Sequence, residues 1–187
     1  INTINDFKQN FSEYFELKII NENLIIENTL LKNNSINTAE NDSIISDENY
    51  TYIPAKIISN SIKFSKNFIT INKGINQKIN VEDGVISKIG VIGIINNNSD
   101  KFSTVISILN TDLKINAKVK NTNHFGSLSW DANNFQIMNL DDVPKSALIK
   151  NGDTIQTGGM SSIFPENIPI CLLYTSDAAD DDQCVGL

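Results

Sequence analysis

The sequence predicts a mainly β protein with an N-terminal α-helical coiled coil and two small antiparallel β-barrel-like subdomains. Three observations support this fold class. Residues 1–34 have apolar side chains at helical spacings of three and four, and they contain neither Gly nor Pro. From Tyr50 onward, apolar residues alternate with polar ones instead. Turn-forming clusters of Asn, Asp and Gly separate the alternating runs, and no helical pattern lies among them.

The helical segment contains a heptad repeat. Leucines recur every seven residues, and a second series precedes each of them by three residues: Leu17, Leu24 and Leu31, preceded by Tyr14, Asn21 and Asn28. With Leu at position d and Asn at position a, the pattern is typical of a parallel two-stranded coiled coil, in which buried Asn pairs select register and strand number. The sequence therefore predicts a homodimer through this seam. The alternative is an amphipathic helix that packs on its own globular domain.

The rest of the chain divides into a linker and strands. Residues 35–49 are polar, mildly acidic and aperiodic, which is typical of a linker. The run from Leu113 to Lys120 alternates without error and predicts a strand with one buried face. Gly90 and Gly93 predict a bend within one long strand. We expect the other strands within 50–58, 67–72, 85–95, 102–109 and 135–140, the first β-barrel subdomain at 50–120 and the second at 121–170.

The residues from 171 onward differ in composition from the rest. The chain has 31 Ile, 28 Asn, 15 Lys and no Arg, yet residues 171–187 contain no Ile, Asn or Lys. They hold both cysteines and four aspartates, so residues 1–170 carry a formal charge of −3 rather than −7. We interpret 171–187 as a non-native tail translated from sequencing-adapter read-through; the alternative is a genuine acidic tail. On the first interpretation the second subdomain is truncated and has an exposed edge.

Charge and residue usage exclude several classes of protein. A formal net charge of −7 argues against a basic nucleic-acid binder, and the absence of Arg removes the guanidinium fork that holds phosphates. A single histidine, His124, leaves most His-based metal sites without ligands. No run approaches the roughly 18 apolar residues of a membrane helix. We therefore expect no metal, no cofactor and no nucleic-acid partner.

A serine hydrolase is the nearest catalytic possibility. Ser161 and Ser162 follow a Gly-Gly-Met sequence, and small β-barrels host serine proteases. A catalytic triad also needs a histidine base with an acid behind it, and His124 lies in a polar turn. The sequence lacks a recognisable nucleophile loop, so we expect no enzyme activity.

Other polar or aromatic features fit structural roles. The acidic pairs Glu82–Asp83 and Asp141–Asp142 are expected to cap strands or face water in turns rather than to share a proton. The alternative is bound calcium, although the spacing matches no known calcium-binding loop. Trp130, the only tryptophan, is expected to fill a barrel rather than to bind a ligand. The segment 152–159 contains glycines, but it lacks both the glycine spacing and the Lys of a Walker phosphate-binding loop.

Five segments carry a family resemblance in their order along the chain. They are YIPAKIISN at 52–60, NFITINKG at 67–74, DGVI with GVIGII at 83–95, GSLSWD at 126–131, and GDTIQTGG with FPENIPI at 152–170. Together they resemble the β domain of the rod shape-determining MreC family, in its Bacteroidota version. The family pattern differs from this chain at Gly158, Asn167 and Cys171, where it usually has Ser, Gly and Gly. The positions that match the motifs are Asn67, Phe68, Asn72, Lys73, Gly74, Gly90, Gly93, Gly126, Trp130, Gly152, Asp153, Gly159, Phe164 and Pro165.

The resemblance implies a bitopic inner-membrane protein whose N-terminal membrane helix and C-terminal end are missing from this chain. The coiled coil and the paired barrels would then lie in the periplasm. Family members have no enzyme activity and join MreD, MreB and the elongation transpeptidase. They also self-associate into dimers or filaments.

We therefore expect a non-catalytic periplasmic scaffold of the cell-elongation machinery, which organises peptidoglycan synthesis and cell shape. Candidate partner contacts are apolar residues at strand edges, namely Tyr52, Phe68 and Ile69, although each of them also fits a core position. The alternative function is a protease-like β-barrel module that binds peptide or cell-wall glycan.

Overall fold

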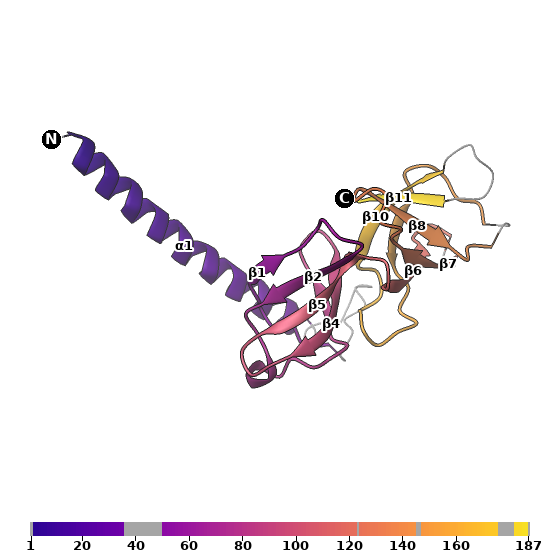
Figure 1. The fold of residues 1–187 in the computed structure, drawn as a ribbon, viewed down its shortest axis with the longest axis horizontal. Coiled ribbons are helices and arrows are strands. Elements are labelled where there is room, and N and C mark those ends of the chain that lie inside the picture. Colours follow the sequence, from indigo (N-terminus) through magenta and orange to yellow (C-terminus); the bar gives the residue numbers. More distant parts are fainter. Residues whose placement is uncertain (1, 36–49, 123, 145–146, 176–181, 187) are drawn as a thin grey trace. The chain divides into compact units, whose positions relative to one another are not determined.

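The computed structural model describes residues 2–35, 50–122, 124–144, 147–175 and 182–186 (Figure 1). The chain divides into two compact units. The first, Ile1–Pro54, contains helix α1, and the second, Ala55–Leu187, contains the β-strands. In the part of the chain that the structure describes, no helix has a stretch long and apolar enough to cross a membrane.

Helix α1 spans Asn2–Ser35, which confirms the helix predicted for residues 1–34. The seam leucines, Leu17, Leu24 and Leu31, are 51–66% exposed, and Asn21 and Asn28 are exposed as well. The side chain of Tyr14 and the linker after residue 35 lie outside the described residues. A single chain shows the helix but not the coiled coil, which stays a prediction.

The C-terminal end of α1 is tied to a segment that precedes the strands. Asn33 Oδ1 accepts a hydrogen bond from the backbone N of Tyr52 at 2.9 Å, and Asn33 Nδ2 donates to the Tyr52 carbonyl at 3.2 Å. The Lys32 ammonium lies 5.2 Å from the centroid of the Tyr52 ring, within the range of a cation–π contact. These contacts hold Tyr52 beside the last turn of the helix.

The first sheet is antiparallel and has the strand order β1-β2-β5-β4-β3. Its elements are β1 (Ile57–Asn60), β2 (Lys66–Ile71), the 3₁₀ helix η1 (Ile75–Gln77), β3 (Gly84–Ile86), β4 (Val91–Asn98) and β5 (Ser103–Asn110). The strands predicted for 67–72 and 102–109 are confirmed. The prediction that this subdomain is a barrel is wrong, because the strands at its two ends, β1 and β3, do not pair with each other within the described residues.

Two further strand predictions need correction. Residues 50–56 are not a strand, and β1 begins only at Ile57; Pro54, which has no backbone N–H, lies just before it. Residues 85–95 are not one bent strand but the hairpin β3–β4, in which Val85 pairs with Gly93. Gly90 occupies the hairpin connection with a φ of +151°, a conformation that L side chains rarely adopt.

The second sheet is a closed antiparallel barrel with the order β10-β11-β8-β7-β6-β9. Its strands are β6 (Lys114–Val119), β7 (Phe125–Ser129), β8 (Ile137–Asp141), β9 (Thr154–Thr157), β10 (Pro169–Thr175) and β11 (Asp182–Gly186). The predicted subdomain boundary at 120 is wrong, because β6 pairs with β7 and β9 rather than with the first sheet. Ala117, for example, lies opposite both Gly126 and Thr157.

The expected open edge of the second subdomain is also absent from the structure. β10 runs on through Cys171–Thr175, and β11 pairs with both β10 and β8 and closes the barrel. Cys171 and Leu173 are completely buried, so the part of this strand beyond residue 170 contributes to the barrel core. The non-native origin of residues 171–187 stays a prediction, and residues 176–181 lie outside the described part.

Each sheet has its own apolar core. The larger cluster fills the barrel and includes Ile115, Val119, Leu128, Trp130 and Ile155. Apolar residues of the first sheet pack against it from outside, namely Ile86, Val91, Ile94, Ile106, Ile108 and Leu109. The smaller cluster consists of Ile69, Ile71, Ile79, Ile95 and Val105. Burial of apolar surface at about 25 cal/mol per Å² therefore stabilises both the barrel and its contact with the first sheet.

Candidate partner-binding surface

The residues required for a serine hydrolase do not come together. Ser161 Oγ accepts a hydrogen bond from the backbone N of Ile163 at 3.2 Å. His124 lies in the β6–β7 connection, where its carbonyl accepts from Val119, and its Nδ1 is buried without a hydrogen-bond partner among the described residues. No hydrogen bond joins His124 to Ser161 or Ser162 in the described chain, and a triad requires such a bond or a close approach to it.

Glu82 and Asp83 lie in the turn region before β3, as predicted, whereas Asp141 is the last residue of β8 and Asp142 follows it in a bend. Asp83 accepts a hydrogen bond from the backbone N of Asn80 at 2.7 Å, and Asp141 accepts from the Ser129 hydroxyl at 3.0 Å. Glu82 and Asp142 have positive φ angles of 73° and 64°. Within the described residues, no group of three or more His, Cys, Asp or Glu side chains is placed to hold a metal ion.

The Asn-Lys-Gly turn of the family motif has a structural role. Asn72 Oδ1 accepts a hydrogen bond from the backbone N of Lys56 at 2.7 Å, and the Lys73 carbonyl accepts from the Ser103 hydroxyl at 2.7 Å. A Cβ at Gly74 would lie 2.0 Å from the Ser99 carbonyl oxygen. The turn therefore joins three parts of the first sheet at a position where only Gly fits.

Most other motif glycines also allow close backbone approach. A Cβ would lie 2.4 Å from the Pro169 oxygen at Gly90, 2.0 Å from the Ile106 oxygen at Gly93 and 2.7 Å from the Asp141 oxygen at Gly126. Gly152 and Gly159 instead have positive φ angles of 89° and 73°. These motif glycines therefore serve backbone packing and turn conformation, and they do not gather at one binding site.

The remaining motif residues of the barrel are buried or hydrogen-bonded. Trp130 is 5% exposed, and its Nε1 donates to the Asn134 carbonyl at 2.8 Å, which confirms its predicted role in the barrel core. Asp153 accepts from Asn121 Nδ2 at 2.8 Å, and Phe164 is 5% exposed. The Pro165 carbonyl accepts a hydrogen bond from the Thr157 hydroxyl.

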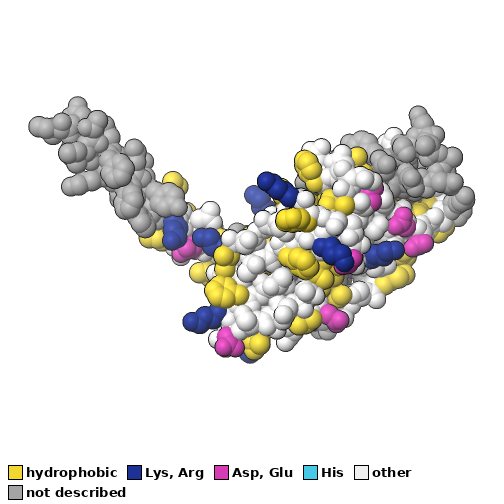
Figure 2. Space-filling model, viewed as in Figure 1, with side chains coloured by type: hydrophobic (Ala, Val, Ile, Leu, Met, Phe, Trp, Pro, Cys, Tyr) yellow, Lys and Arg dark blue, Asp and Glu magenta, His cyan; other side chains and the backbone are white. Residues whose placement is uncertain are grey.

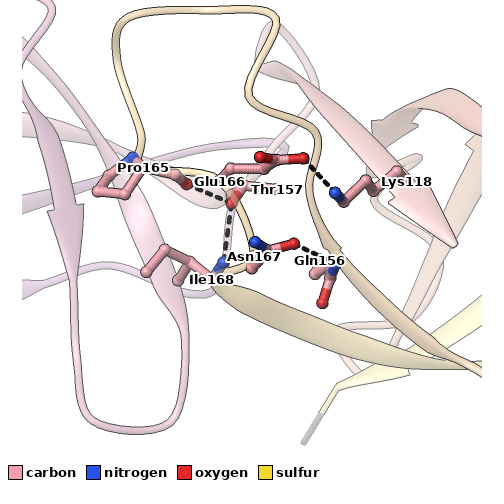
Figure 3. A network of polar contacts seen from close by, with 7 residues as sticks. All are labelled: Lys118, Gln156, Thr157, Pro165, Glu166, Asn167 and Ile168. Carbon is pink, nitrogen blue, oxygen red and sulfur yellow. Dashed lines mark hydrogen bonds and ion pairs between the residues drawn. The ribbon is translucent and has the colours of Figure 1, made fainter. Parts of the chain in front are cut away.

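The segment 158–168, which carries Phe164 and Pro165, is held to the barrel by polar contacts (Figure 3). Thr157 Oγ1 donates to the Pro165 carbonyl at 2.6 Å and accepts from the backbone N of Ile168 at 2.9 Å. The ammonium of Lys118, whose side chain is only 7% exposed, forms an ion pair with Glu166. Because Phe164 and Ile163 also contact Gly84 of β3, this segment connects the barrel to the first sheet.

A hollow of about 200 Å³ lies beside the same segment. Its walls include Ile94 of the first sheet and Ile115 of the barrel, together with Ile163 and Phe164. The residues with polar side chains that line it are Lys114, Asn116, Thr157 and Ser161. This set contains no acid and no histidine, so the hollow does not have the groups of a general acid–base site.

The three candidate partner contacts have different environments. Ile69 is 4% exposed and belongs to the core, so it is excluded as a contact. Tyr52 is half-buried beside Asn33. Phe68 is 39% exposed, because alternation along β2 places it on the face opposite Ile69.

Phe68 is one of several exposed apolar residues on or between β1 and β2. Ile57 lies opposite the buried Ile71 and therefore on the other face of the sheet from Phe68. We define the β1–β2 patch as the remaining exposed apolar residues of this region, which are 39–67% exposed: Ile58, Ile62, Phe64 and Phe68. Apolar side chains also gather elsewhere on the face of the molecule drawn in Figure 2. β1 pairs with β2 alone among the described strands, so its other edge offers unpaired backbone groups beside the patch.

The patch is held in shape by a buried side chain. Asn67 is completely buried, and its Oδ1 accepts from the backbone N of Phe64 at 3.1 Å. The Ser61 hydroxyl accepts from the backbone N of Phe68 at 2.8 Å and lies 3.2 Å from its carbonyl oxygen, to which it donates. Sequence reasoning missed Phe64, although its place three residues before the motif Asn was a usable signal.

Comparison with known proteins identifies the fold. The model of the rod shape-determining protein MreC, barrel core, matches residues 57–183. Among curated proteins, none matches the sequence. The structure is similar to MreC from Pseudomonas aeruginosa, with a TM-score of 0.64 and 20% identity over 72% of this chain and 89% of that chain.

Two further solved structures share the fold. MreC of Listeria monocytogenes has a TM-score of 0.62 and 21% identity over 96% of this chain and 86% of that one. MreC in a complex between penicillin-binding protein PBP2 and MreC from Helicobacter pylori has a TM-score of 0.56 and 20% identity over 73% of this chain and 86% of that one. Because the family model covers more than half of the sequence, the chain belongs to the rod shape-determining MreC family.

Proposed function

We propose that this chain is a non-catalytic periplasmic scaffold of the cell-elongation machinery and that it binds the elongation transpeptidase through the β1–β2 patch. The exposed apolar patch is the observation that carries the proposal, since large exposed apolar clusters mark protein–protein interfaces. The Helicobacter pylori relative, which was solved in complex with PBP2, supports a transpeptidase as the partner. By family resemblance, MreD and MreB are further partners, and an N-terminal helix outside this chain anchors the protein in the inner membrane.

The patch is tested by removing its two aromatic side chains. We expect Phe64→Ser with Phe68→Ser to weaken binding of the purified chain to the transpeptidase of the same bacterium by at least about tenfold, because aromatic side chains dominate interface energies. Phe135→Ser is the matched control, since Phe135 is 66% exposed but belongs to the barrel. If the double variant and the wild type bind the transpeptidase equally tightly, the β1–β2 patch is excluded as the binding surface.

The absence of catalysis is a separate part of the proposal. Among the described residues no hydrogen bond joins Ser161 or Ser162 to His124, and Ser161 Oγ accepts from the backbone N of Ile163, so we expect neither hydroxyl to be activated as a nucleophile. We expect no labelling of either serine by a fluorophosphonate probe. Labelling at one of them would instead support the protease-like module.

We also propose that α1 forms a parallel homodimer through the predicted seam. In that arrangement Ile20 of one helix lies opposite Ile25 of the other, and Glu27 lies opposite Lys32. Ile20 and Ile25 are 48% and 45% exposed in the single chain, so pairing would bury them. The seam is therefore complementary to a second copy of itself.

Sedimentation of the purified chain tests the homodimer. We expect a dimer at micromolar concentrations and a monomer after Leu24→Ser, which removes the central leucine of the described seam. A wild-type chain that stays monomeric would exclude this part of the proposal and leave the patch unaffected.

A further inference from the structure

Helix α1 has a second apolar stripe that the seam does not use. It consists of Ile19, Ile26 and Leu30, which are 58%, 51% and 54% exposed. With Asn23 between the first two, the spacing is four, three and four residues, so all four positions lie on one face of the helix. At 3.6 residues per turn, this face lies about a third of a turn away from the seam leucines. Apolar side chains on the described part of the helix are visible in Figure 2.

The residues that flank the second stripe carry negative charge. In the heptad of this stripe, Ile19 and Ile26 occupy position d and Leu30 occupies position a, which places Glu22 at g and Glu27 at e. Both glutamates lie on exposed positions. Lys18 and Lys32, the two lysines of residues 17–35, lie at neither flanking position.

The charge pattern decides against a second copy of this chain on the stripe. In a parallel pair, Glu22 of one helix would face Glu27 of the other, and like charges at these positions repel. In an antiparallel pair that overlaps along residues 19–30, e faces e and g faces g, so glutamate again meets no lysine. The seam differs, because there Glu27 would face Lys32. One helix thus has a self-complementary face and a self-repelling face.

We propose that the second stripe binds a helix of a different protein, one whose apolar a and d residues are flanked by lysine or arginine. Such a partner would cover the three aliphatic side chains and place positive charge beside Glu22 and Glu27. The proposal goes beyond self-association through the seam and beyond the β1–β2 patch. Neither of them accounts for exposed Ile19, Ile26 and Leu30.

Two synthetic helical peptides test the proposal. Both carry Leu at a and d; one has Lys at e and g, and the other has Glu. We expect the Lys peptide to bind the full chain at least about tenfold more tightly than the Glu peptide in fluorescence anisotropy at low salt. Ile26→Ser should remove this binding, and Glu22→Lys should shift the preference toward the Glu peptide.

Leu24→Ser is the matched control, because it changes one aliphatic residue of the seam and none of the second stripe. It should abolish self-association in sedimentation and leave binding of the Lys peptide unchanged, and circular dichroism checks that each variant keeps its helix. The proposal is overturned if both peptides bind equally or if Leu24→Ser, but not Ile26→Ser, removes the binding. It is also overturned if Ile26→Ser turns a larger homo-oligomer into a dimer, since a further copy of the chain would then occupy the stripe.

Discussion

The buried amide of Asn67 holds both backbone polar groups of Phe64. Asn67 Nδ2 donates to the Phe64 carbonyl at 2.6 Å, while Oδ1 accepts from the Phe64 N–H at 3.1 Å. The same Nδ2 donates to the Leu109 carbonyl at 2.7 Å. A completely buried residue of the family motif thus connects the end of β5 to the loop that presents an aromatic side chain, itself 67% exposed, on the β1–β2 patch.

Asn67→Ala should destabilise the fold by about 1–3 kcal/mol, because it leaves part-buried backbone groups of Phe64 and Leu109 without these partners. Urea unfolding followed by circular dichroism measures the change. Asn96→Ala, at an exposed position of β4, is the control and should stay within about 0.5 kcal/mol of the wild type. Equal stability of the two variants would show that the Asn67 contacts do not stabilise the sheet.

Gly93→Ala should be more destabilising than Gly152→Ala. At Gly93 the new methyl group would lie 2.0 Å from the Ile106 carbonyl oxygen, so β4 and β5 must separate locally, at a cost of about 3 kcal/mol. At Gly152 nothing lies within 4 Å, and only the φ of +89° opposes the substitution, at about 1 kcal/mol. Thermal unfolding of both variants gives the comparison, and a reversed order would contradict it.

The ion pair of Lys118 and Glu166 should respond unequally to loss of each partner. Glu166→Gln leaves the ammonium of Lys118, whose side chain is 7% exposed, without its counter-charge, and we expect a loss of about 2–3 kcal/mol. Lys118→Met keeps much of the side-chain volume and leaves Glu166, which is 37% exposed, in contact with water, so the loss should be below about 1 kcal/mol. Urea titrations measure both free energies of unfolding. Equal losses would indicate that water reaches Lys118.

Stability should depend on pH through Asp131. Hydrogen bonds from the backbone N–H and then the side chain of Asn133 hold the pKa of Asp131 below its ordinary value of 3.8, against a smaller opposing effect of burial. A lowered pKa in the folded state contributes stability above pH 3.8 that is lost as the pH falls through the lowered pKa. Because the side chain is exposed, the effect is small.

The stability difference between the wild type and Asp131→Asn should therefore shrink when urea unfolding is repeated below pH 3.8. A difference that is the same at neutral and at acidic pH would rule out this contribution of the carboxylate.

Several elements follow from local sequence pattern. The absence of Gly and Pro together with apolar spacings of three and four predicts α1, and alternation predicts β2, β5 and β6 close to their observed bounds. The core position of Trp130 is also confirmed. Each of these features depends on residues within one or two turns or one strand, where periodicity carries the information.

Pairing between strands was not predictable in the same way. β6 alternates perfectly, yet alternation does not say whether its partners are β5 or β7 and β9. Gly90 marks a change of direction, but the pattern alone does not separate a bend from the β3–β4 hairpin. Closure of the barrel by β10 and β11 joins residues whose composition differs from that of the strands they meet.

The sequence by itself determined where the helix and the strands β2, β5 and β6 form, and which classes of catalytic site lack the side chains that they need. Only the tertiary structure decided that the first sheet is open and the second closed, that Ile69 is buried while Phe68 is exposed, and that Asn67 holds Phe64. The physical reason is that periodicity is a property of neighbouring residues. Burial and hydrogen bonding of a given side chain depend instead on segments far apart along the chain, such as Asn67 and Leu109.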